Sequence, residues 1–147
     1  MNIRNFLFGK TKLFETAKLG TFKATIRNEK TRKEVVWLST VAIPDYADEI
    51  TIILEGDGYA PDQQQIESAT RIVESIQRLH DELIASIMSD HGLREKYRSI
   101  DLQALRLACL NPWEINLNNY ELSFESLTNE AVGVSAIVQD GKIIEID

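Results

Sequence analysis

The sequence predicts an α+β domain with a mostly antiparallel sheet of about six or seven strands, packed against one long helix and two short ones. Three observations carry this prediction. Apolar and polar residues alternate with period two before residue 56, a long stretch from residue 61 repeats at steps of three and four, and alternation returns after residue 112. The order strands, helices, strands is typical of α+β domains, and few parallel crossovers are available.

The first part of the chain predicts three strands after a lead-in. Residues 1–18 carry scattered apolar residues that fit either a short amphipathic helix or an extended segment packed on the body. Strands follow over 21–27, 35–43 and 49–55, with a polar hairpin connection at 28–33 and an Asp-Gly turn at 57–58.

The strongest helix signal runs from Pro61 to Ser89. Pro61 suits the first helical position, Asp62 complements the dipole of the first turn, and His91-Gly92 supplies a stop. One apolar face repeats along it at alternating steps of three and four: Ile66, Ala69, Val73, Ile76, His80, Leu83 and Ile87.

Two short helices are expected next, over 93–98 and 101–110, the second with a leucine face and a break at Asn111-Pro112. Alternation then predicts strands over 113–117, 120–124, 131–138 and 142–146. Asp140-Gly141 is a strong hairpin signal between the last two.

Length and composition indicate one cytoplasmic domain. The 147 residues fit a single domain (1–147), and 44% apolar residues suffice for a core. The single cysteine, Cys109, excludes an intramolecular disulfide and suits a reducing compartment. No signal peptide and no apolar run of membrane-spanning length is present, so we expect no membrane association.

Charge is unevenly distributed along the chain. The net charge is −7, yet residues 1–37 hold nine Lys/Arg against three Asp/Glu, and the acidic excess lies in 38–147. The basic stretch is either solvated surface or one charged binding face. The protein as a whole should be repelled by nucleic acid and attracted to basic partners.

No pattern in the sequence indicates an enzyme. Neither HExxH nor a glycine-rich phosphate loop is present, and we expect no cofactor and no metal. His80 falls in the apolar stripe, which indicates a core histidine, and His91 is too far along the helix to share a metal with it. Cys109, within the leucine-rich segment, is interpreted as a small core residue.

Two groups of carboxylates are candidates for a site. They are Glu55, Asp57 and Asp62 around the turn before the long helix, and Glu121, Glu125 and Glu130 on or near the late hairpin. Either group could hold Ca²⁺, act as an acid/base pair or form an acidic partner-binding face. Of the two tryptophans, Trp37 and Trp113, an exposed one beside acids would suit an interface.

The last third of the chain resembles small bacterial families of unknown function, some of them associated with polymorphic toxins as immunity proteins. The resemblance rests on Tyr120-Glu-Leu-Ser-Phe124, on Glu130 before a Gly133-Val strand and on the closing Asp140-Gly-Lys-Ile hairpin. The sequence has Leu127, and no histidine nearby, where these families often have Trp and His. The resemblance implies an uncharacterised bacterial protein and carries no catalytic residue.

Three hypotheses follow for the function. The first is a non-enzymatic protein-binding domain, such as an immunity protein that neutralises a basic toxin through the acidic residues. The second is a structural module that forms a homo-oligomer. The third is an enzyme or small-ligand domain whose site is assembled from residues distant in the sequence, which a concave pocket would favour.

Overall fold

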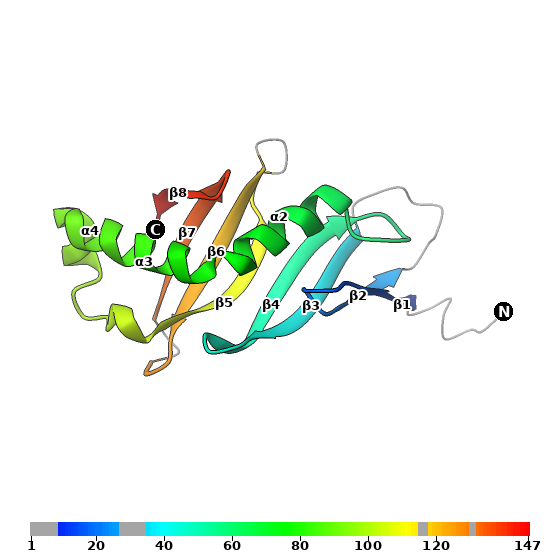
Figure 1. Cartoon of the computed structure of the whole chain (residues 1–147), viewed down its shortest axis with the longest axis horizontal. Helices are drawn as coiled ribbons and strands as arrows, with labels where there is room; N and C mark the ends of the chain where they lie inside the picture. Colours follow the sequence, from blue (N-terminus) through cyan, green and yellow to red (C-terminus); the bar gives the residue numbers. More distant parts are fainter. Residues whose placement is uncertain (1–8, 27–34, 115–117, 130–131) are drawn as a thin grey trace.

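The computed structural model describes residues 9–26, 35–114, 118–129 and 132–147. In these residues, eight strands form one sheet whose spatial order follows the order of the chain (Figure 1). All neighbouring strands pair antiparallel except β4 and β5, which are parallel. The α+β class and the mostly antiparallel sheet are therefore confirmed, whereas six or seven strands was too few.

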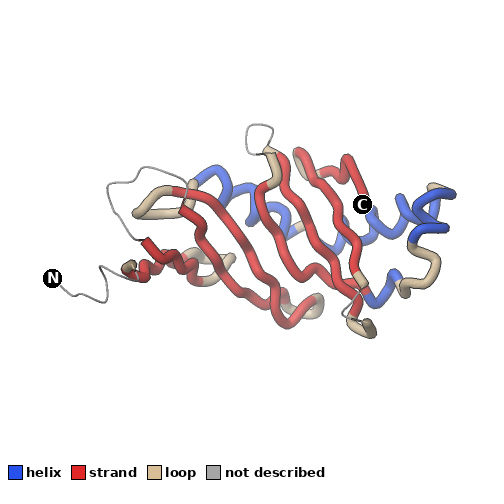
Figure 2. The backbone as a smooth tube through the Cα atoms, turned by 180° about the vertical axis from the view of Figure 1, so that it is seen from behind, coloured by secondary structure: helices blue, strands red, loops and turns tan. Residues whose placement is uncertain are grey.

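The helices all lie on one side of this sheet (Figures 1 and 2). The elements are β1 Lys10–Glu15, β2 Thr21–Ile26, β3 Val35–Ile43, β4 Ala47–Gly56, α2 Gln63–Glu74, α3 Ile76–Ser89, α4 His91–Lys96, a short 3₁₀ helix Leu102–Ala104, β5 Leu105–Pro112, β6 Asn119–Ser126, β7 Gly133–Gln139 and β8 Lys142–Ile146. The expected hairpin at 28–33 and most of the expected strand at 113–117 lie outside the described residues.

The core fills the space between the helices and the facing side of the sheet. On β4, Ile50, Ile52 and Leu54 are fully buried, and Leu79 and Leu83 of α3 are buried as well. The alternation on the strands and the 3.6-residue repeat on the helices thus face each other. Burial of each such side chain contributes about 1.5–3 kcal/mol relative to exposure.

The long helix begins later than expected and is interrupted. Asp62 is the N-cap, and its carboxylate accepts a hydrogen bond from the Gln65 N–H at 3.0 Å, so the helix starts at Gln63. Pro61 instead bridges to Gly56. Ser75 leaves helical geometry with φ −103° and ψ 9°, and this residue divides the predicted helix into α2 and α3.

The expected helix over 101–110 is wrong for most of its length. Only Leu102–Ala104 form a helical turn, and β5 follows at once. Leu105, Leu107 and Leu110 are buried, with a bulge between Leu107 and Cys109 that keeps the leucines on the core side. Pairing with β4 and β6 in the sheet outweighs the helical propensity of leucine.

The first strand decides between the two alternatives for the start of the chain. Lys10–Glu15 forms β1 and pairs with β2 over its whole length, from Lys10 opposite Ile26 to Glu15 opposite Thr21. The amphipathic helix is therefore wrong for residues 10–15, whereas the extended alternative agrees with β1, which is paired into the sheet. Residues 1–8 lie outside the described part of the chain.

Strands β4 and β5 pair over a short length and separate toward one end. Their register joins Thr51 with Cys109 and Ile52 with Leu110. Beyond this pairing, the Leu107 N–H donates to the Tyr46 hydroxyl at 3.1 Å. Burial raises the pKa of Tyr46 to about 12, so the phenol stays protonated at neutral pH. The Tyr46 hydroxyl thus accepts the hydrogen bond from β5 that a neighbouring strand would otherwise accept.

His80 is a core residue, as the sequence indicated. Its ring lies 5.7 Å from the ring of Tyr46, in edge-on contact, and 5.7 Å from that of Phe124. Nε2 lies 3.4 Å from the Leu102 carbonyl oxygen, and Nδ1 has no hydrogen-bond partner in the described structure. Burial first, and the nearby Arg106 charge second, lower the pKa of His80, against the opposing effect of the Leu102 carbonyl.

We expect the Tyr46→Phe variant to unfold more easily than the wild type. Without the hydroxyl, the Leu107 N–H loses its acceptor, which costs about 1–3 kcal/mol when the donor is buried. Urea denaturation measures the difference in free energy of unfolding. The matched control is Tyr59→Phe, because Tyr59 is 70% exposed. Equal stability of the two variants would contradict the role given to Tyr46.

We also expect His80 to make the protein less stable in mild acid. Its folded pKa lies below the ordinary value of 6.5, so below that pH the unfolded chain takes up a proton that the folded chain does not. The free energy of unfolding should fall between pH 7.5 and pH 5.5 in wild type. It should fall less in His80→Leu than in wild type. A His80→Leu slope equal to wild type would refute this assignment.

Candidate functional site

The side of the sheet turned away from the helices, which we call the open face, carries exposed apolar side chains. Figure 2 shows this side of the sheet in front of the helices. One row crosses four strands: Leu13 lies opposite Lys23, Lys23 opposite Leu38, and Leu38 opposite Ile53. Residues directly opposite each other in antiparallel strands point to the same side of the sheet.

Three of the apolar side chains on the open face are strongly exposed. Leu13 is 62%, Val36 52% and Leu38 46% exposed. Their strand neighbours Phe22 and Trp37 fill the core on the other side. A solvated sheet face usually carries polar residues, and neighbouring exposed apolar residues mark interaction sites. We call Leu13, Val36, Leu38 and Ile53 the apolar patch. Lys23 lies within it, between Leu13 and Leu38.

One carboxylate adjoins the apolar patch, and three others lie further across the same face. Glu55 lies directly opposite Val36. Further across the sheet, Glu121 lies opposite Ile137, which in turn lies opposite Glu145. Glu125 lies opposite Arg106. We call Glu55, Glu121, Glu125 and Glu145 the acidic patch, which has Arg106 as a basic neighbour.

The six carboxylates predicted from the sequence do not form a single site. Glu55 on β4 and Glu121 and Glu125 on β6 share the open face, with β5 between the two strands. At about 4.8 Å per strand, β4 and β6 are about 10 Å apart across the sheet. Along the strands, the register places Glu55 about 7 Å from the level of Glu121 and about 20 Å from that of Glu125, at about 3.3 Å per residue. Glu130 lies outside the described residues.

Asp57 and Asp62 serve the local backbone. The Asp57 carboxylate accepts hydrogen bonds from the N–H groups of Tyr59 at 2.7 Å and Ala60 at 3.0 Å, and these bonds lower its pKa. Asp62 is the cap of α2. Their closeness to Glu55 in the sequence therefore reflects turn and helix-cap chemistry.

The tryptophans separate into a core and a surface residue. Trp37 is fully buried, and its indole N–H donates to the Asp57 carbonyl oxygen at 3.0 Å. Trp113 is 57% exposed just after β5. The exposed Trp113 is therefore the tryptophan that a partner could contact.

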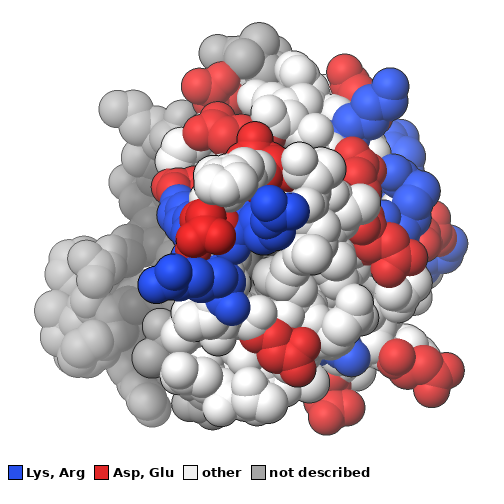
Figure 3. Space-filling model, turned by 90° about the vertical axis from the view of Figure 1, so that its left-hand side faces the viewer, with Lys and Arg blue, Asp and Glu red and all other residues white. Residues whose placement is uncertain are grey.

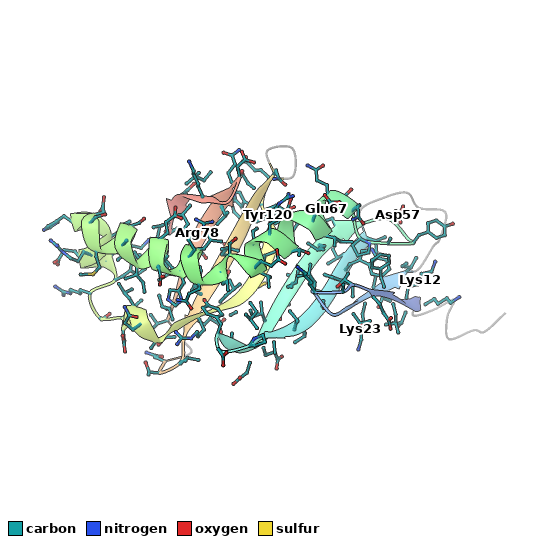
Figure 4. The ribbon with its side chains drawn as sticks, in the orientation of Figure 1. Lys12, Lys23, Asp57, Glu67, Arg78 and Tyr120 are labelled. Carbon is teal, nitrogen blue, oxygen red and sulfur yellow. The ribbon has the colours of Figure 1, made fainter. Side chains whose placement is uncertain are left out.

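The described lysines of the basic N-terminal stretch lie around β1 and β2. Lys18 pairs with Glu74, and the ammonium of Lys12 lies 4.7 Å from the centre of the Tyr59 ring. Lys12 and Lys23 are both in this part of the molecule, and Asp57 lies at the end of β4 (Figure 4). Arg4, Arg27, Lys30, Arg32 and Lys33 lie outside the described residues.

The end of the molecule formed by α4 has a mixed charge. Lys/Arg and Asp/Glu side chains are interspersed there (Figure 3). Lys96 pairs with Asp147 at 2.6 Å and Arg98 with Glu95 at 3.6 Å. Exposed pairs of this kind contribute little to stability. This end therefore offers no single-sign surface to a charged partner.

Cys109 is on a strand, not in the helix expected from the sequence. It is half-buried and lies opposite Ser123, on the open face between Glu121 and Glu125. Burial raises the pKa of the Cys109 thiol, and the two carboxylates add to the effect. A thiol with a raised pKa is a poor nucleophile at neutral pH.

No metal centre is found in the described ranges, where no three His, Cys, Asp or Glu side chains are placed to share an ion. None of the helices described is long and apolar enough to cross a membrane. Comparisons with protein-family models, with curated proteins and with solved structures find no match to this chain. The resemblance to immunity-protein families therefore stays a prediction.

We expect Cys109 to react slowly with iodoacetamide at pH 7.5, compared with a free thiol, because little thiolate is present. Glu121→Gln should accelerate alkylation by removing one of the charges that raise the pKa. Mass spectrometry follows the modified fraction over time. The control is Glu95→Gln, which removes a carboxylate on α4 and should leave the rate of alkylation unchanged. Equal rates in both variants would contradict the electrostatic contribution of Glu121.

Proposed function

We propose that the protein is a non-enzymatic protein-binding domain that docks a basic partner on the open face of its sheet. The observation that carries the proposal is that the apolar patch and the acidic patch adjoin each other on the open face. Val36 of the apolar patch lies directly opposite Glu55 of the acidic patch. A partner with an apolar contact surface beside Lys or Arg side chains complements both.

The two patches would contribute differently to binding. Removal of exposed apolar area from water supplies affinity, at roughly 25 cal/mol per Å² before the costs of association. The carboxylates attract a basic partner over longer distances and orient it, which raises the association rate. The patches lie on hydrogen-bonded strands, so little ordering of the backbone is needed on binding.

A basic toxin fits this surface and agrees with the resemblance to immunity-protein families. Nucleases that bind phosphate backbones are basic, and an acidic inhibitor can cover the same surface that they offer to nucleic acid. We place the interaction in the cytoplasm, where a lone thiol such as Cys109 stays reduced. Nucleic acid itself would be repelled by the net charge of −7.

The test starts from the tagged wild-type protein, which is used to capture a partner from native extract at low and moderate salt, with identification by mass spectrometry. Binding of the purified partner is then measured for two variants. Leu38→Asn should weaken affinity at least tenfold, mainly through faster dissociation, because it removes part of the apolar patch. Glu121→Lys/Glu125→Lys should slow association and reduce its dependence on salt.

The matched controls lie away from the two patches. Met88→Asn changes an apolar residue of α3 that is 52% exposed, and Glu95→Lys reverses an exposed charge on α4. Both should bind as wild type. A partner that is acidic, or whose binding tolerates the Leu38 and Glu121/Glu125 changes, would contradict the proposal. Capture of a second copy alone would favour the homo-oligomer.

A further inference from the structure

The apolar patch contains a cation whose position a basic partner does not explain. Lys23, labelled in Figure 4, lies on β2 directly opposite Leu38, and its side chain is exposed on the open face. Within the described part of the chain, no carboxylate lies within ion-pair distance of Lys23. An ammonium attracts a carboxylate and gains nothing from Lys or Arg. A surface that covers Lys23 together with the apolar residues should therefore carry an acidic group.

The exposed residues of β3 form a strip with opposite charges on its two sides. Val36 and Leu38 are its apolar residues, and we call these two residues the β3 strip. On the β2 side, Lys23 lies opposite Leu38. On the β4 side, Glu55 lies opposite Val36, and Ile53 lies opposite Leu38. The strip thus has a cation along one side and an anion along the other.

A strip of this kind is complementary to itself under two-fold symmetry. The axis that achieves this runs along β3, between two copies packed with their open faces together. It places Val36 on Val36 and Leu38 on Leu38 of the other copy. The same rotation exchanges the two sides of the strip, because β2 and β4 both lie about 4.8 Å from β3.

The exchange brings opposite charges together in two places. Lys23 of each copy comes to lie over Ile53 of the other copy, and Glu55 is two residues further along β4. Packed sheets are about 10 Å apart and two residues span about 7 Å, so the Cα atoms of Lys23 and Glu55 would be about 12 Å apart. A lysine and a glutamate side chain together span this distance. Two symmetric ion pairs would therefore flank the paired strips.

The rest of the acidic patch stays outside this contact. The rotation places β1 of one copy over β5 of the other, whereas Glu121, Glu125 and Glu145 lie beyond β5, on β6 and β8. Two copies of net charge −7 repel each other, but physiological salt screens this repulsion beyond about 8 Å. Five strands present about 400 Å² to the other copy, less than the roughly 800 Å² per partner of a standard interface. Association should therefore be weak and reversible.

We propose that the protein, when no partner is bound, pairs with a second copy through the β3 strip and so masks its own apolar patch. The masking role rests on the proposed function. A second copy offers an apolar surface beside a lysine, which are the two features that we assign to the basic partner. The second copy and the partner thus compete for the same strip, and a rising partner concentration separates the dimer.

The test measures self-association of the purified full chain by sedimentation equilibrium at physiological salt. The mass of wild type should rise from one chain toward two between about 10 μM and 1 mM. Lys23→Glu and Glu55→Lys should each dimerise at least about tenfold more weakly, because each brings like charges together twice. The matched control is Lys142→Glu on β8, which changes the net charge as Lys23→Glu does and should dimerise as wild type.

An equimolar mixture of Lys23→Glu and Glu55→Lys gives the sharpest result. Both charge pairs of the mixed dimer have opposite signs again, so the mixture should associate at least about tenfold more tightly than either variant alone. Thermal unfolding like wild type checks that both variants fold. A mixture no tighter than its components would overturn the proposal.

A wild type that stays monomeric up to about 1 mM would also overturn self-association. That outcome would leave the basic partner of the proposed function untouched, because the measurement uses this protein alone. Dimerisation as expected, with capture of an acidic partner in place of a basic one, would instead support the pairing of copies and contradict the proposed function.

Discussion

The parallel pairing of β4 with β5 is the constraint on which the rest of the structure depends. Parallel neighbours need a long crossover, and here the chain from Pro61 to Ala104 supplies it as three helices and a 3₁₀ turn. The crossover lies on one side of the sheet and covers its apolar residues. The core and the exposure of the opposite side both follow from that placement.

Because the helices cover only one side of the sheet, the residues on the other side must be compatible with exposure to water or to a partner. On a sheet that only faces water, the outward positions would be polar. Over β5 to β8 they largely are, as Glu121, Ser123 and Glu125 show. Over β1 and β3 they include Leu13, Val36 and Leu38, so the apolar patch is the feature that solvation alone does not explain.

Period-two and 3.6-residue patterns predicted the class of fold and most elements, because they report directly on which side of each element is buried. They failed at β5, where leucines at 105, 107 and 110 fit a helix as well as a bulged strand. The apolar patch also escaped prediction, although four consecutive apolar residues from Val35 to Leu38 indicate a strand that is apolar on both sides. Carboxylates were grouped by sequence position, whereas Asp57 and Asp62 accept hydrogen bonds from nearby backbone. Glu55 and Glu121 share a face of the sheet only because of the strand register, with β5 between them.

The edges of the sheet explain why association should use its face. Exposed edge strands invite pairing with another chain unless charges discourage it. The outermost strand β1 carries Lys10 and Lys12, and β8 carries Lys142 and Glu145. Charges at both edges disfavour extension of the sheet by a second copy. Leu13 of the apolar patch is on β1 itself, whereas Val36, Leu38 and Ile53 lie inward on β3 and β4, where their burial would need a partner that covers the face of several strands at once. A protein surface of matching shape and basic charge meets that requirement, whereas a single added strand does not.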